Sequence, residues 1–372
     1  MSNPLLSLKG LPEFSKIKPE HVKPAVEQAI ESCKATIARV LSENSSYTWD
    51  NLVAPINEAD DILGRLWSPV SHMNSVISSD ELREAYESCL PLLSEHGTFV
   101  GQHEGLYQAY RQIADSDAYH KLDTAQRKVL DNALRDFKLS GIALNDEDKK
   151  RYGEISTQMS ELGSKFNNNV LDATHAFDVL ITDEKELAGM PPSALDGAKA
   201  LAESRDKSGW LFTLDIPSYL PVMMYCDNRE LRQKLYHAFI TRASELGPNG
   251  GEFDNSAIMN ELLALRHELA NLLGFDSFAD NSLATKMANS RQEVLDFLYQ
   301  LADKSKPQGE KDLAQVTEFA KAQFNCETIE PWDLPYYSEK LKQDKYAISD
   351  EELRPYFPES KVIPGLFEVV RR

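Results

Sequence analysis

The stretch from Asn255 to Met287 reads NSAIMNELLALRHELANLLGFDSFADNSLATKM, and it best indicates how the chain folds. Its apolar residues return every three or four positions, at Ile258, Leu262, Leu265, Leu269 and Leu272. This spacing lines one stripe of an amphipathic helix. Residues 254–256 are good N-caps, and Gly274 suits the position after a helix, where φ is often positive. We expect this helix to pack its stripe against a partner helix.

The same residues resemble a known family. The segment RHELANLLGFDSFADNSLATKMA, from Arg266, is similar to the signature that precedes the catalytic part of the M3 family of zinc oligopeptidases. The likeness continues in FSKIKPEHVKPAV at Phe14–Val26, SPVSHMNSV at Ser68–Val76 and PWDLPYYSEKL at Pro331–Leu341, and it covers essentially the whole chain. It implies a mainly α fold, the helical lobes of the neurolysin-like zincin architecture, with a deep channel that admits oligopeptides and excludes folded proteins.

Charge and cysteine usage narrow the class of protein. The net charge of −19 repels phosphate backbones and anionic lipid, which argues against nucleic acid and membranes as partners. No run approaches the roughly 20 apolar residues of a membrane helix, and the start, MSNPLLSLKG, lacks the features of a signal peptide. The four cysteines, Cys33, Cys89, Cys226 and Cys326, form no CxxC pair. We read them as buried free thiols in a reducing compartment and infer a cytoplasmic protein.

Helical periodicity dominates the chain, whose 372 residues exceed one ordinary domain. We expect an N-terminal helical lobe at residues 1–140 and a second helical region at 141–372. The second region starts with a long helix from Tyr152 to Phe177. It also holds two short β-prone runs, 177–181 and 210–214, which we expect to pair as a small β ribbon.

Proline and glycine mark the expected helix ends. Pro69 should end or kink one helix, and Pro307 should break or restart another, because proline lacks the backbone N–H and clashes with the preceding turn. The cluster at 247–251, GPNGG, is the clearest loop. Two further helical segments are expected at 80–93 and 96–113.

The sequence contains none of the common catalytic motifs. It has no GxSxG, no GxxxxGK[ST] and no GxGxxG after a strand, and no two of its eight histidines stand four apart, as the HExxH zinc motif requires. The nearest imitation places Asn271 four residues after His267, so we read His267 as an exposed or hydrogen-bonded helix residue. His96 and His103, seven apart, are too distant along a shared helix to chelate. We therefore predict no catalytic residue and no metal ligand.

Aromatic residues gather near the end of the chain, at Trp332, Tyr336, Tyr337 and Tyr346. Such rings offer rigid contact area, and a tyrosine hydroxyl can bond a peptide backbone. In the resembled family this region borders the substrate channel, so these four are the predicted substrate-channel residues. Ordinary packing beneath a loop is an equal alternative for each.

The chain stops at Arg372 inside an apolar helical pattern, VIPGLFEVVRR, which begins at Val362. We interpret the chain as the N-terminal, non-catalytic part of a cytoplasmic zinc metalloendopeptidase that hydrolyses short peptides. The zinc would then belong to a missing C-terminal catalytic half, and this chain, one wall of the channel, would bind none and be inactive alone. Two alternatives stay open: a peptidyl-dipeptidase of the same family, and a non-enzymatic helical scaffold that binds peptides.

Overall fold

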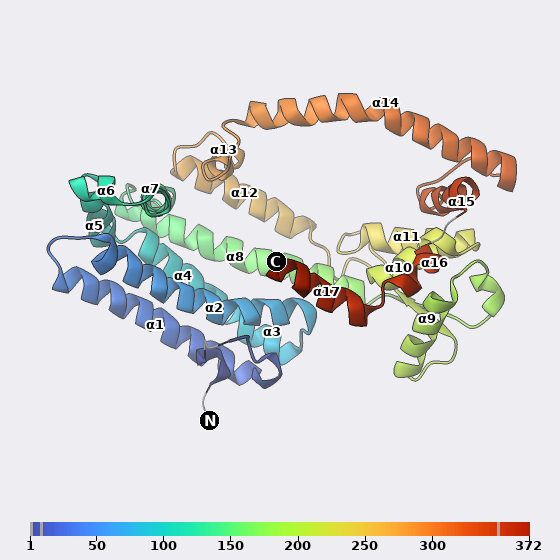
Figure 1. The fold of residues 1–372 in the computed structure, drawn as a ribbon, viewed down its shortest axis with the longest axis horizontal. Helices are drawn as coiled ribbons and strands as arrows, with labels where there is room; N and C mark the ends of the chain where they lie inside the picture. Colours follow the sequence, from blue (N-terminus) through green and yellow to red (C-terminus); the bar gives the residue numbers. More distant parts are fainter. Residues whose placement is uncertain (1–2, 8–9, 348–349) are drawn as a thin grey trace. The chain divides into compact units, whose positions relative to one another are not determined.

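The computed structural model describes residues 3–7, 10–347 and 350–372, and helices dominate their regular structure (Figure 1). The mainly α fold predicted from the sequence is confirmed. The chain divides into two compact units, the first made of residues 1–166 and 258–291 and the second of residues 167–257 and 292–372. Each unit is discontinuous in sequence, whereas the predicted lobes, 1–140 and 141–372, are single stretches. The division into two lobes, 1–140 and 141–372, therefore stays a prediction.

The first unit is built of helices. They are η1 Pro4–Leu6, η2 Phe14–Lys16, α1 Pro19–Glu43, η3 Trp49–Val53, α2 Ala54–Val76, α3 Asp80–Glu87, α4 Leu90–Gly101, α5 Glu104–Ala114, α6 Asp117–Lys121, α7 Thr124–Leu139, most of α8 Asp146–His175, α12 Ser256–Leu272 and α13 Phe278–Leu283. Helix α1 packs along α2, and apolar residues at helical spacing on both, including Val26, Cys33 and Leu66, enter one core cluster. A second cluster joins α1 to α5 and α7.

The stretch from Asn255 to Met287 contains the amphipathic helix, α12, that its spacing predicts. Four residues of the α12 stripe are buried, namely Ile258, Leu262, Leu265 and Leu269. The partner helix is α8, whose Ile155 is fully buried against Leu265 and Leu269. Gly274 has φ of +80°, the left-handed conformation that a residue with a Cβ adopts only with strain.

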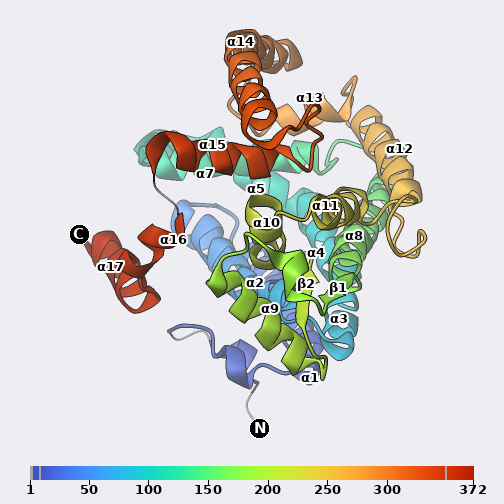
Figure 2. The ribbon, with the colours of Figure 1, turned by 90° about the vertical axis from the view of Figure 1, so that its right-hand side faces the viewer.

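The second unit contains the sheet. Strands β1 Asp178–Ile181 and β2 Trp210–Thr213 pair antiparallel, with Val179 opposite Phe212, which confirms the predicted ribbon. Figure 2 shows the ribbon beside α9 and α10. The other elements are η4 Glu184–Leu187, α9 Pro192–Ser204, α10 Ile216–Tyr225, α11 Arg229–Thr241, α14 Arg291–Phe324, α15 Leu334–Tyr346, α16 Asp350–Leu353, η5 Arg354–Tyr356 and α17 Glu359–Arg371.

Neither Pro69 nor Pro307 ends its helix, because packing in one case and solvent in the other compensates for the missing hydrogen bond. Helix α2 continues past Pro69 to Val76, because Val70 and Met73 beyond the proline belong to the same core cluster as Leu66 before it. Helix α14 continues past Pro307 (Figure 1), and the stretch around that proline is exposed, so water can bond the carbonyl that the proline leaves free.

Two expected helical segments are each split in the structure. The segment at 80–93 divides between α3 and α4. The segment at 96–113 breaks after Gly101, because the ring of His103 accepts a hydrogen bond from Leu106 N at 3.1 Å and thereby caps a new helix, α5. His96 and His103 therefore lie in different helical segments, and the loop at 247–251 is present as predicted.

Candidate functional site

Three of the predicted channel residues, Trp332, Tyr336 and Tyr337, lie at the start of α15, where there is a buried ion-pair network. The carboxylate of Asp333 is fully buried and accepts hydrogen bonds from Arg229 Nη2 at 2.6 Å and from Arg232 Nη2 at 2.8 Å. Although Asp333 stands at the N-cap position of α15, its side chain makes no cap bond, because the two arginines occupy it. Burial raises the pKa of the Asp333 carboxyl, but these donors outweigh burial and hold the pKa below its usual range.

Arg232 ties the network to the aromatic cluster. Its guanidinium is 1% exposed, donates from Nη1 to the carbonyl of Cys226 at 2.6 Å and lies 4.1 Å from the ring centroid of Tyr336. The hydroxyl of Tyr336 donates to Asp227 Oδ1 at 2.7 Å, beside the ammonium of Lys340. Burial, and next the hydrogen bond to Asp227, raise the pKa of Tyr336.

Tyr336 and Tyr337 pack edge to face, with ring centroids 5.1 Å apart, and both are buried, at 5% and 7% exposed. Burial, followed by the contact with Cys326, raises the pKa of Tyr337 to about 12. Both phenols therefore stay protonated at neutral pH and serve as hydrogen-bonding and packing groups.

The other two aromatic residues are more accessible. Trp332 is half-buried against Tyr236 and His237, and its indole N–H has no hydrogen-bond partner among the described residues. Tyr346, at the last turn of α15, is 72% exposed. The fold thus brings Trp332, Tyr336 and Tyr337 together around one end of α15 and leaves Tyr346 at the other end.

Sequence reasoning missed the charged members of this cluster, Asp227, Arg229, Arg232, Asp333 and Lys340. Arg229 and Arg232 are three residues apart on α11, a spacing that places both on one helix face. That signal exists in the sequence, but nothing local indicates that their partner is Asp333, about a hundred residues further on.

In the segment that most nearly matches a zinc motif, the side chains of His267 and Glu268 both make other contacts. His267 is exposed, and its Nε2 lies 3.0 Å from the side-chain nitrogen of Asn271, as a hydrogen-bonded helix residue. Glu268 accepts two hydrogen bonds from Arg151, at 2.6 and 2.8 Å, and these bonds lower the pKa of its carboxyl. A glutamate held by an arginine is a poor general base, so this segment fits no catalytic zinc.

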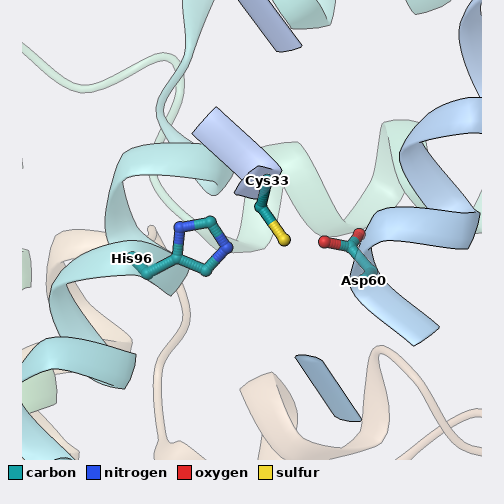
Figure 3. Close-up of side chains that lie close together, drawn as sticks. All are labelled: Cys33, Asp60 and His96. Carbon is teal, nitrogen blue, oxygen red and sulfur yellow. The ribbon is translucent and has the colours of Figure 1, made fainter. Parts of the chain in front are cut away.

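One group of potential metal ligands does converge, in the first unit. The sulfur of Cys33, a carboxylate oxygen of Asp60 and a ring nitrogen of His96 all lie within 4.8 Å of one another. In Figure 3 an imidazole nitrogen and a carboxylate oxygen face the sulfur from opposite sides. These residues come from α1, α2 and α4, and Asp60 and His96 also line a cavity of about 470 Å³.

Comparison with known proteins defines the class. Residues 222–372 match Peptidase family M3, and residues 26–149 match the N-terminal domain of neurolysin and thimet oligopeptidase. Over residues 222–372 the chain is thus similar to peptidase family M3, and over residues 26–149 to the N-terminal domain found in its members neurolysin and thimet oligopeptidase. The resemblance seen in the sequence is thereby confirmed.

Individual relatives make the similarity more specific. The chain is 62% identical to oligopeptidase A of Salmonella typhimurium over 372 residues, which cover 100% of this chain and 55% of that protein. It is 36% identical to the probable cytosolic oligopeptidase A of Arabidopsis thaliana, of which it covers 53%. Identity to the dipeptidyl carboxypeptidase of Salmonella typhimurium is 26%, over 98% of this chain and 54% of that protein. The chain thus spans about half the length of the curated relatives it matches.

None of the described helices combines the length and the low charge that crossing a bilayer requires. All four cysteines are free thiols, as predicted; Cys33, Cys89 and Cys226 are buried, whereas Cys326 is half-buried.

Proposed function

We propose that this chain is the N-terminal, non-catalytic part of a zinc-dependent oligopeptidase that cleaves short peptides in the cytoplasm. The observation that carries the proposal is the 62% identity to oligopeptidase A across the whole chain, in a sequence that contains no HExxH motif. The catalytic zinc and its ligands then belong to the part of the relatives' length that this chain does not cover. The contacts of His267 and Glu268 support the same division.

Exposed apolar side chains on two helices support the proposal that a further part of the protein packs against this chain. Helix α14 exposes a run of large apolar side chains, including Phe297, Leu298 and Leu301. Helix α17 does the same with Leu366, Phe367 and others. Exposed apolar patches of this kind mark interaction surfaces. The partner that we propose for them is the C-terminal catalytic half.

We further propose that α15, together with Trp332 just before it, contributes to one wall of the peptide channel. Trp332 and Tyr346 are accessible enough to contact a substrate, whereas Tyr336 and Tyr337 would support that wall from within. The Asp333 network would make the wall rigid, because it joins α15 to α11 through a fully buried carboxylate. Residues 1–140 would form the N-terminal lobe of the same enzyme.

The dipeptidyl carboxypeptidase alternative is less favoured, because identity to that relative is 26% rather than 62%. The peptide-binding scaffold would become the better interpretation if no zinc motif follows Arg372 in the gene. Analysis of the products distinguishes the two kinds of peptidase. An endopeptidase cuts inside a peptide whose ends are blocked, whereas a peptidyl-dipeptidase releases dipeptides from the C-terminus.

The test is an assay of an internally quenched peptide with two proteins, residues 1–372 and a version extended by the sequence that follows Arg372 in the gene. We expect turnover only by the extended version, and loss of that turnover with a chelator. Chelator-sensitive turnover by residues 1–372 alone would place the active site within residues we assign to the scaffold.

The proposed role of Trp332 and Tyr346 in the channel can be tested separately, through KM and kcat. In the extended version, Trp332→Ala and Tyr346→Ala should raise KM with little change in kcat, because they remove contact area away from the reacting bond. Tyr356→Ala is the matched control for Tyr346, since that side chain is 79% exposed and outside the proposed wall. Unchanged KM in both variants would remove α15 from the channel.

A further inference from the structure

We propose that Cys33, Asp60 and His96 form a three-ligand site for a divalent transition-metal ion of the zinc class. Thiolate, imidazole and carboxylate are the donors that Zn²⁺ takes in proteins, and three protein ligands leave one position for water. The sequence predicts no such site, because its three donors are far apart along the chain and only the packing of α1 against α2 and α4 joins them.

The distances fit an ion after a small adjustment. A tetrahedral ion with bonds of about 2.0–2.3 Å holds its ligand atoms about 3.3–3.8 Å apart. The three donor atoms lie within 4.8 Å of one another, so the widest pair must close by at most about 1.5 Å. Asp60 can supply this movement, because its side chain is exposed, whereas the two other donors are fixed in the interior.

His96 and Cys33 are the two buried members of the proposed site. His96 is 6% exposed, and its Nε2 is the ring nitrogen that faces the Cys33 sulfur in Figure 3. Its Nδ1, on the far side of the ring, has no hydrogen-bond partner among the described residues. A neutral imidazole keeps a lone pair on Nε2 for a metal. The thiol of Cys33 donates a hydrogen bond of 3.3 Å to the carbonyl of Ala59, and it gives up this bond when an ion replaces the proton.

The charges also balance. In the empty site the Cys33 thiol keeps its proton, which forms the hydrogen bond to the carbonyl of Ala59. When the ion binds, the S–H proton leaves to water and an S–metal bond forms. One thiolate and one carboxylate then neutralise the dication.

The cavity supplies the route and the fourth position. Its walls combine Asp60, His96 and Tyr110 with apolar residues such as Leu63, Trp67 and Phe137. Its volume of about 470 Å³ accommodates a metal-bound water. The bound ion would crosslink α1, α2 and α4 and so stabilise the first unit.

The direct test is a cobalt(II) titration of metal-free residues 1–372 under a phosphine reductant. We expect one equivalent to bind, with a near-ultraviolet thiolate-to-cobalt band that Zn²⁺ then removes, and a rise in thermal midpoint with Zn²⁺. Cys33→Ala should abolish the band. Asp60→Asn and His96→Gln should weaken binding by about 100-fold or more, at least the loss seen for outer-shell partners.

Matched controls come from neighbouring residues of the same types. Cys89→Ala removes another buried thiol, Asp61→Asn the next carboxylate on α2, and His120→Gln a histidine outside the cavity; none should change the titration. Circular dichroism of each metal-free variant establishes that it is folded. If Cys33→Ala does not fold, His96→Gln decides the question.

Absence of the thiolate band in the unmodified chain would overturn the proposal. So would a band that survives Cys33→Ala, or full affinity in Asp60→Asn or His96→Gln. Because the band requires a thiolate, an ion bound by other carboxylates or histidines cannot imitate it.

Discussion

Asp333, fully buried at the start of α15, accepts a hydrogen bond of 2.8 Å from the equally buried Arg232 on α11. The two residues are 101 positions apart in sequence. A charge taken out of water is stable in a protein only when it is paired, so each residue holds the other in the interior.

We expect Asp333→Asn to lower the free energy of unfolding of the second unit by about 3–5 kcal/mol, because it leaves the buried guanidinium of Arg232 without its counter-charge. Urea unfolding followed by tryptophan fluorescence measures the change. Glu327→Gln is the control, since Glu327 pairs with Lys321 at 2.6 Å on the surface and should cost less than about 1 kcal/mol. Equal effects of the two changes would contradict the assignment.

The pair of Asp333 and Arg232 should also make the free energy of unfolding depend on pH. Because the pKa of Asp333 is lower in the folded state, the folded protein binds fewer protons there than the unfolded chain. The contribution is therefore complete above the ordinary carboxyl pKa of about 4 and is lost as pH falls through the folded pKa. Urea unfolding of the unmodified chain and of Asp333→Asn, from neutral pH downward, should show a stability gap that narrows only below about pH 4. A gap that is the same at every pH would contradict this.

The cysteines should differ in reactivity. We expect a thiol reagent to modify Cys326 first in the native protein, because it is half-buried while Cys33, Cys89 and Cys226 are buried. Burial also raises the pKa of each of those three thiols, which reduces the reactive thiolate. Mass mapping after timed labelling identifies the order, and the denatured, non-reduced chain should react at all four. Cys326→Ser should remove the fast phase, and a fast phase that persists would refute the order.

The apolar face of α17 should make the isolated chain self-associate. Leu366, Phe367 and Val370 are between 60% and 77% exposed on one short helix. Phe367→Ser with Val370→Ser should shift the chain toward monomer in sedimentation velocity, because it removes apolar area from the contact. Met287→Ser is the control, since Met287 is 98% exposed but stands outside this helix. A monomer at every concentration before mutation would show that the face needs no partner.

Local rules account for most of the elements. Asp123 and Gln126, three residues apart in the sequence, form a capping box at the start of α7. Strands Asp178–Ile181 and Trp210–Thr213 form where the two β-prone runs lie. Helix boundaries were predicted less well. Pro69 and Pro307 lie inside continuous helices, because packing in one case and solvent in the other compensates for the missing bond. The family resemblance and the clustering of aromatic residues pointed to the predicted site residues. Neither signal pointed to the charged residues that contact them, such as Arg232 and Asp333.

By itself the sequence determined the helical class, the family resemblance and the absence of an HExxH motif, because periodicity and motif spacing are properties of neighbours along the chain. Only the tertiary structure decided that Asp333 meets Arg229 and Arg232, and that Cys33, Asp60 and His96 converge. The physical reason is that such contacts form between residues on separate helices. Which side chains meet there depends on how the apolar faces of whole helices pack, and no local spacing encodes that.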